Sequence, residues 1–143
     1  MRTRRFFAER AWVVDVSGCE DGYLIEVEDL KEVQNSFRKG DSLLIRSDWY
    51  KKLGSDTYRN GLPRISEALA RWCVEYQVKI LGVEPPSVAD VNDLEEVTTI
   101  HRILLGNVII VEGLCHLDQI TKPHVQLIAL PSKFKREMGH PAE

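Results

Sequence analysis

The feature that most constrains this sequence is a set of short, nearly continuous apolar runs separated by segments with helical spacing. The runs occupy residues 12–16, 42–46, 78–83, 108–111 and 125–130. Val, Ile and Leu dominate them, and Gly, Pro or a polar residue follows each one. Runs of this length and composition predict strands that are buried on both faces.

The segments between these runs favour helices. Residues 28–37 predict a short helix, and Pro63 precedes a second one in which Ser66 is a candidate N-cap and Glu67 suits the helix dipole. On the second helix, one apolar stripe is formed by Ile65, Ala68, Leu69, Trp72 and Tyr76. Residues 97–105 favour a third helix. Strands that alternate with helices predict an α/β fold.

Composition limits the classes of partner. The 143 residues suffice for one domain, and a net charge of −3 gives no general attraction to nucleic acid or to an anionic membrane. The one basic cluster, Arg2, Arg4 and Arg5, is expected to be a solvated end. No apolar run approaches the roughly 20 residues that a membrane-spanning helix needs.

The cysteines indicate a reducing compartment. Cys19, Cys73 and Cys115 are odd in number and widely spaced, which fits neither a disulfide framework nor a zinc knuckle. Glu9 and Arg10 interrupt the only apolar residues near the N-terminus, so no signal-peptide core is present there. We therefore expect a cytoplasmic protein with free thiols.

Several blocks of the sequence occur in a distinctive order. The first is GDSLLIRSDW at residues 40–49, and the second runs from LPRISEA at 62–68 to VKILGVEPPSV at 78–88. The third is HRILL at 101–105, followed by EGL at 112–114 and LD at 117–118. LIALP at 127–131 and the Gly-His-Pro at 139–141 close the series.

Together these blocks resemble the cyclase family, whose members include kynurenine formamidase and isatin hydrolase. The resemblance covers nearly all of residues 11–141. It implies a swivelling β/β/α domain and a metal-dependent hydrolase that acts on a small amide of the N-formylkynurenine type. Zn²⁺ or Mn²⁺ is the implied cofactor, and a homo-oligomer is the expected assembly.

The sequence also departs from the family pattern. It contains no HxGTHxDxPxH stretch, which in the family supplies most metal ligands and a histidine for proton transfer. The family's last strand, after the Gly-x-Pro turn, is absent as well. We therefore expect one partial domain over residues 1–143, with residues 1–10 and 132–143 as flexible ends and with impaired or absent activity for the chain alone.

The resemblance assigns His101 and Glu112 as metal ligands, since an imidazole and a carboxylate suit Zn²⁺ or Mn²⁺. Their interval is one residue shorter than in the family, and such a shift inside a strand would turn Glu112 to the other face. A change within the turn at residues 106–107 would preserve the geometry. Without the resemblance, we would interpret His101 as a histidine at a helix end and Glu112 as a surface carboxylate.

Three further sites have competing readings. Trp49 follows a strand and is a candidate for substrate contact, although a Trp there also suits a core position. Glu84 and Ser87 flank the pair Pro85-Pro86 and are expected mainly to form a turn. Cys115, His116 and Asp118 lie close to Glu112 in sequence, but two of them match no ligand position of the family. The alternative function is a non-catalytic remnant or interaction protein that kept the fold without the metal site.

Overall fold

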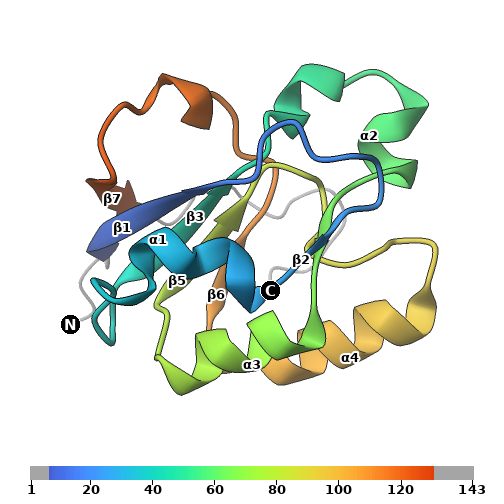
Figure 1. Ribbon diagram of the computed structural model, residues 1–143. Helices are drawn as coiled ribbons and strands as arrows, with labels where there is room; N and C mark the ends of the chain where they lie inside the picture. Colours follow the sequence, from blue (N-terminus) through green and yellow to red (C-terminus); the bar gives the residue numbers. More distant parts are fainter. Residues whose placement is uncertain (1–6, 131–143) are drawn as a thin grey trace, which may run out of the picture.

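The computed structural model describes residues 7–130, which build one five-stranded sheet with helices against it (Figure 1). The strands of this sheet are β1 (Phe7–Asp15), β3 (Ser42–Arg46), β5 (Ile80–Val83), β6 (Ile109–Val111) and β7 (His124–Ala129). Two short strands, β2 (Leu24–Ile25) and β4 (Arg64–Ile65), form a separate parallel pair. The α/β fold class predicted from the sequence is confirmed.

The helical segments are mostly short. The α-helices are α1 (Lys31–Gln34), α2 (Asp56–Asn60), α3 (Glu67–Glu75) and α4 (Leu94–Leu104). Three 3₁₀ turns accompany them: η1 (Val27–Leu30), η2 (Trp49–Lys52) and η3 (Leu117–Gln119). Ser66 caps α3 as predicted, since its hydroxyl accepts a hydrogen bond from the Leu69 amide at 3.0 Å.

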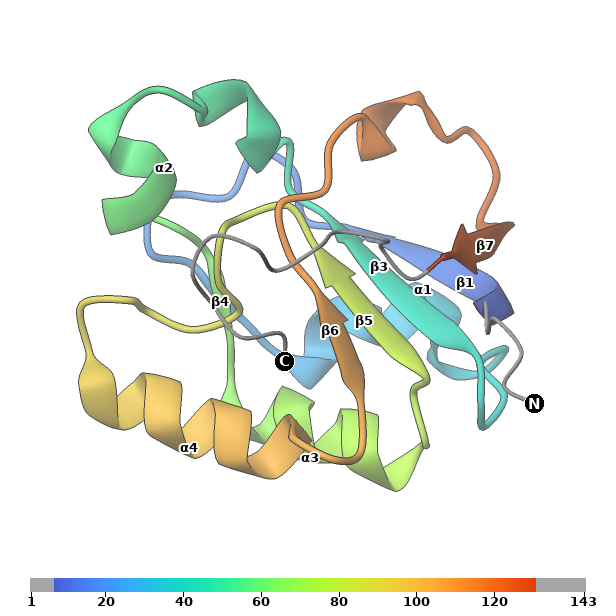
Figure 2. The same cartoon turned by 180° about the vertical axis from the view of Figure 1, so that it is seen from behind.

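Strand order across the sheet is β6-β5-β3-β1-β7. The first four strands are parallel, and β7 runs antiparallel to β1 at one edge. Seen from behind, β6 lies at the opposite edge, and α3 and α4 lie side by side below the sheet (Figure 2). Because these four strands are parallel, their carboxyl ends all lie at the same end of the sheet, which is called the carboxyl edge below.

The two faces of the sheet are covered unequally. The main core lies on the helix face, where Leu43, Ile45 and Leu81 pack with Leu69 of α3 and Leu104 of α4. On the other face, Ala11 and Leu44 pack against Leu117 and its neighbours from the segment after β6. Among residues 7–130, no helix combines the length and apolarity needed to cross a bilayer.

Several predicted boundaries were wrong. The first strand begins at Phe7, so residues 7–10 are not a flexible end: β7 pairs with them. The expected helix at 28–37 is a 3₁₀ turn followed by one helical turn that stops at Gln34, after which Phe37 packs into the core. The third helix begins at Leu94, because Asp93 caps it by accepting from the Glu96 amide. The expectation for residues 132–143 lies outside the described residues.

Candidate active site at the carboxyl edge of the sheet

The ends of the parallel strands bring several polar side chains to one edge. β1 ends at Asp15 and β3 at Arg46, while Glu84 directly follows β5 and Glu112 directly follows β6. In open α/β sheets, ligands bind outside the carboxyl ends of the strands. This edge is therefore the candidate active site.

Glu84 links the ends of two neighbouring strands. Its carboxylate is fully buried and accepts hydrogen bonds from the backbone amides of Ser47 at 3.1 Å and Tyr50 at 3.2 Å. Burial raises the pKa of the Glu84 carboxyl, and the amide hydrogen bonds oppose that rise. The sequence suggested a turn-forming role here, and the structure shows a buried anchor for the loop that follows β3.

Beside Glu84, the Ser47 hydroxyl is buried and has no hydrogen-bond partner within residues 7–130. A buried hydroxyl without a partner costs free energy. Its backbone amide is used by Glu84, so the residue is held in place through its main chain.

An ion-pair network covers the end of β3. Arg46 contacts Asp48 through two hydrogen bonds, of 2.8 and 3.1 Å, and Asp15 at 3.3 Å. The hydrogen bonds from Arg46 lower the pKa of the Asp48 carboxyl. Asp48 has a φ of 61°, a left-handed conformation that redirects the chain into η2. The network therefore stabilises a strained turn at the candidate site.

Residues after β6 close the same edge. The Tyr50 hydroxyl donates to Asp118 at 2.9 Å, and the His116 ring lies 4.8 Å from the Tyr50 ring, centroid to centroid. Burial and the Asp118 carboxylate raise the pKa of Tyr50 to about 12, so its phenol stays protonated near neutral pH. Lys51 lies between Asp118 at 3.7 Å and Asp48 at 3.9 Å. The edge thus offers a neutral hydroxyl, the Arg46 and Lys51 cations and several carboxylates.

Trp49, the candidate for substrate contact, is enclosed by protein. Its side chain is only 2% exposed, and its indole nitrogen donates to the Tyr58 carbonyl at 3.0 Å. The ammonium of Lys52 lies 5.1 Å from the ring centroid. These contacts give Trp49 a structural role under η2 and α2, and contact with a substrate stays a prediction.

The two predicted metal ligands occupy different elements. His101 is half-buried on α4, and its Nδ1 lies 2.9 Å from the Val97 carbonyl oxygen. A carbonyl accepts only from a protonated nitrogen, so this contact places a proton on Nδ1. In the neutral imidazole, Nε2 is then the nitrogen with the free lone pair, as in metal-binding histidines. Glu112 is exposed at the carboxyl edge.

The turn that separates α4 from β6 covers residues 105–108, and Gly106 adopts a φ of 83° within it. A residue gained or lost in this turn changes neither the helix face of His101 nor the strand face of Glu112. The turn can therefore take up the shorter interval, and metal ligation by His101 and Glu112 stays a prediction.

The described residues do not complete a metal site. Within residues 7–130, no group of three or more His, Cys, Asp or Glu side chains is arranged to hold a metal ion. The sequence neighbours of Glu112 do not form one either, because Asp118 accepts a hydrogen bond from the Tyr50 hydroxyl and the His116 ring packs, tilted by 58°, against the Tyr50 ring. Since a catalytic metal normally needs three protein ligands, His101 and Glu112 alone do not fit one.

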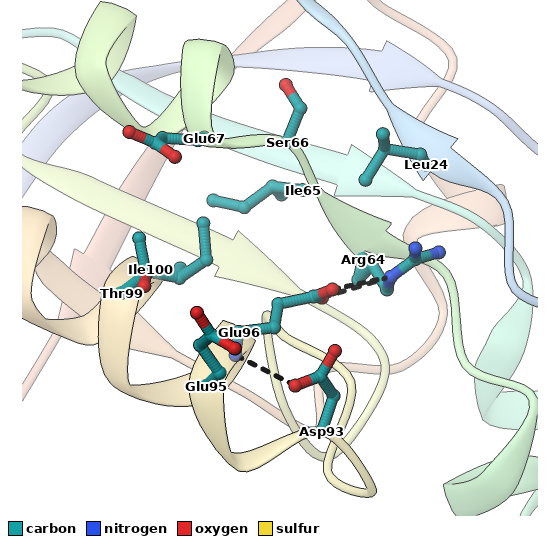
Figure 3. Close-up of a pocket in the computed structure, with 10 residues that line it drawn as sticks. All are labelled: Leu24, Arg64, Ile65, Ser66, Glu67, Asp93, Glu95, Glu96, Thr99 and Ile100. Atoms are coloured by element: carbon teal, nitrogen blue, oxygen red, sulfur yellow. Dashed lines mark hydrogen bonds and ion pairs between the residues drawn. The ribbon is translucent and has the colours of Figure 1, made fainter.

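A separate hollow of about 330 Å³ lies where α3 and α4 begin (Figure 3). Its polar groups contact one another: Arg64 pairs with Glu96 at 3.0 Å, and Asp93 accepts from the Glu96 amide at 3.1 Å. The hollow shares no residue with the carboxyl-edge cluster. Sequence reasoning did not single it out.

Comparison with known proteins decides the family. The Cyclase family model, described as "Putative cyclase", matches residues 1–90, which is more than half of the chain. The chain belongs to the cyclase family. Kynurenine formamidases from Bacillus mycoides and Bacillus cereus are each 26% identical to this cyclase-family chain over 132 residues.

Solved structures show the same fold. Isatin hydrolase A from Labrenzia aggregata, bound to benzyl benzoate, matches 90% of the chain with a TM-score of 0.76 and 21% identity. A predicted metal-dependent hydrolase from Bacillus stearothermophilus matches 75% of it with a TM-score of 0.57 and 20% identity.

This cyclase-family chain spans only part of its relatives. The match covers 92% of the chain but 58% of either kynurenine formamidase. It covers 56% of the Labrenzia isatin hydrolase and 48% of the Bacillus stearothermophilus protein.

Proposed function

We propose that this chain is the α/β part of a cyclase-family hydrolase that acts on a small amide of the N-formylkynurenine type. The observation that carries the proposal is the family match together with a fold that superimposes on isatin hydrolase A over 90% of the chain. The kynurenine formamidases among its relatives supply the class of substrate.

The carboxyl edge supports the proposal chemically. The Lys51 ammonium is a donor that suits an amide carbonyl oxygen, and Asp118 and Asp48 orient it. The Tyr50 hydroxyl donates its one proton to Asp118 and so holds that carboxylate in place. Glu84 accepts a hydrogen bond from the Tyr50 amide and so fixes the loop that presents Lys51. These are binding and orienting roles.

A divalent metal is part of the proposal, and the described residues leave it incomplete. His101 and Glu112 are its two predicted ligands in this chain, and further ligands have to come from a segment with the family's HxGTHxDxPxH motif. We therefore propose that the 143-residue chain by itself has little or no hydrolase activity.

Complementation tests this function. The chain is assayed with N-formylkynurenine and Zn²⁺ or Mn²⁺, alone and mixed with a family segment that carries the motif. We expect hydrolysis only in the mixture, and a loss of at least tenfold with His101→Ala or Glu112→Ala. Undiminished activity of the His101→Ala mixture, or no activity in any mixture, would contradict the proposal.

The alternative is an interaction protein that kept the fold without the metal centre. The absence of a three-ligand group within residues 7–130 is the observation that favours it. It predicts that the motif-bearing segment binds the chain without producing hydrolysis.

A further inference from the structure

The two cations of the carboxyl edge are each shared between two carboxylates. Arg46 contacts Asp15 at 3.3 Å and Asp48 through hydrogen bonds of 2.8 and 3.1 Å. The Lys51 ammonium lies 3.9 Å from Asp48 and 3.7 Å from Asp118. Three carboxylates therefore share two cations, so this network carries an excess of negative charge.

The charges around the network add to that excess. Glu112 is exposed at the same edge and contributes a further carboxylate. Lys52, the next cation along η2, lies over the Trp49 ring, with its ammonium 5.1 Å from the ring centroid. A carboxylate entering the edge would have to displace an ion pair of Arg46 or Lys51 and would meet like charges beside it. A neutral group meets neither cost.

Next to the network, Tyr50 and His116 form a small aromatic surface. Their ring centroids are 4.8 Å apart and the rings are tilted by 58°. His116 is exposed, and its φ of 62° is a left-handed conformation that few residues other than glycine adopt. Its Nδ1 lies 3.5 Å from Gln119 Nε2, which is too long for a strong hydrogen bond. The exposed imidazole thus offers a planar group an aromatic partner.

We infer that the carboxyl edge selects an aryl amide that carries no net negative charge. Its ring packs against the Tyr50–His116 surface, and its carbonyl oxygen accepts a hydrogen bond from Lys51, whose ammonium has three donors to share with the carboxylates. The inference rests on the proposed function, because it names the kind of substrate that the same site takes. N-formylkynurenine, with one ammonium and one carboxylate, meets this condition.

The test is the binding of two unreactive probes to the purified chain, followed by NMR at about pH 8, where histidine side chains are neutral. The probes are acetanilide and 2-acetamidobenzoate, which share the ring and the amide and differ by one carboxylate. We expect acetanilide to shift the signals of Tyr50 and His116 and the anion to bind at least tenfold more weakly. High salt should narrow this ratio, because it screens exposed charges.

Charge variants test the origin of the selectivity. Asp48→Asn keeps a residue type that tolerates the left-handed conformation and releases Arg46 and Lys51 from one carboxylate each. We expect it to reduce the ratio at least threefold. Glu75→Gln, at the exposed C-terminal end of α3, is the matched control and is expected to leave the ratio unchanged.

Two further variants keep the inference falsifiable if Asp48→Asn disturbs the loop. Asp118→Asn retains an acceptor for the Tyr50 hydroxyl and is also expected to reduce the ratio. His116→Ala removes the aromatic partner and not the ion pairs, so it is expected to weaken both probes alike and to leave the ratio unchanged.

The outcomes separate this inference from the proposed function. Equal or tighter binding of 2-acetamidobenzoate to the wild type, or no shift of the Tyr50 and His116 signals by acetanilide, would overturn the inference. Hydrolysis of 2-formamidobenzoate as fast as formanilide by the complemented mixture would overturn it as well, while the hydrolase function stands. The expected probe selectivity without hydrolysis in any mixture would support the inference and contradict the proposed function alone.

Discussion

At the scale of single residues, Glu84 and Trp49 both have structural roles that depend on contacts with other segments of the chain. Trp49, a candidate for substrate contact, is buried with its indole nitrogen bonded to the Tyr58 carbonyl. Glu84, a carboxylate in a turn, is completely buried and holds the loop after β3 through two backbone amides. Those amides offset part of the cost of desolvating the Glu84 carboxylate.

Glu84→Gln tests this anchor. One of the two amides then faces an NH₂ group instead of an oxygen, so we expect a loss of about 1–3 kcal/mol in unfolding free energy near neutral pH. The pKa of Glu84 is raised in the folded state, so its contribution to stability is greatest below its ordinary value of 4.5 and falls as the pH rises through the folded pKa. Denaturant titrations of both proteins at several pH values measure the difference.

The wild type is expected to lose more stability than Glu84→Gln as the pH rises from below 4.5 towards neutrality. Parallel pH profiles for the two proteins would show that the titration of Glu84 is not linked to folding.

At the scale of elements, β5 allows the segment after β6 to reach the sheet. A Cβ atom at Gly82 would lie 2.7 Å from both Leu114 Cδ1 and Leu44 Cδ2. Glycine therefore permits Leu114 to pack on β5. Beside this contact, the Leu114 amide donates a hydrogen bond to the Val83 carbonyl at 3.1 Å. That packing places Asp118 and His116 beside Tyr50.

Gly82→Ala is expected to cost about 1–3 kcal/mol, because the added methyl group overpacks this contact. Leu114→Ala is expected to relieve part of the clash. The double variant should then lose less stability than the sum of the single losses, in a thermodynamic cycle measured by chemical denaturation. Strict additivity would show that Leu114 is not the residue that Gly82 accommodates.

Elements were predicted best where their pattern is local. The five principal strands and the Ser66-capped helix follow from apolar runs and a capping residue. The two-residue strands β2 and β4 carry no such pattern, since they exist only because distant segments meet. The early start of β1 has the same cause, because β7 pairs with residues that look unstructured in isolation.

At the scale of the whole molecule, the described residues build the fold but do not complete a metal site. The sheet, its helices and its core are present within residues 7–130, yet those residues assemble no three-ligand group. The match covers 58% of either kynurenine formamidase. The fold of the family is present, and metal ligation by His101 and Glu112 stays a prediction.

Calorimetric titration of Zn²⁺ and Mn²⁺ into the purified chain tests this division. We expect no tight stoichiometric binding, since two ligands rarely hold a catalytic metal. His101→Ala is the control and should leave the titration unchanged. Tight binding of one metal per chain that His101→Ala removes would show instead that the chain assembles its own site.

The sequence by itself determined the α/β class, the principal strands and the family, because apolar periodicity and ordered motifs are properties of local segments. His101 and Glu112 could be proposed as ligands for the same reason. Only the tertiary structure decided that Glu84 is buried and holds the loop after β3, and that Trp49 is enclosed by protein. The same holds for the hydrogen bond that the Tyr50 hydroxyl donates to Asp118. Each of these depends on residues far apart in sequence, and burial and hydrogen-bond partners exist only after the chain has folded.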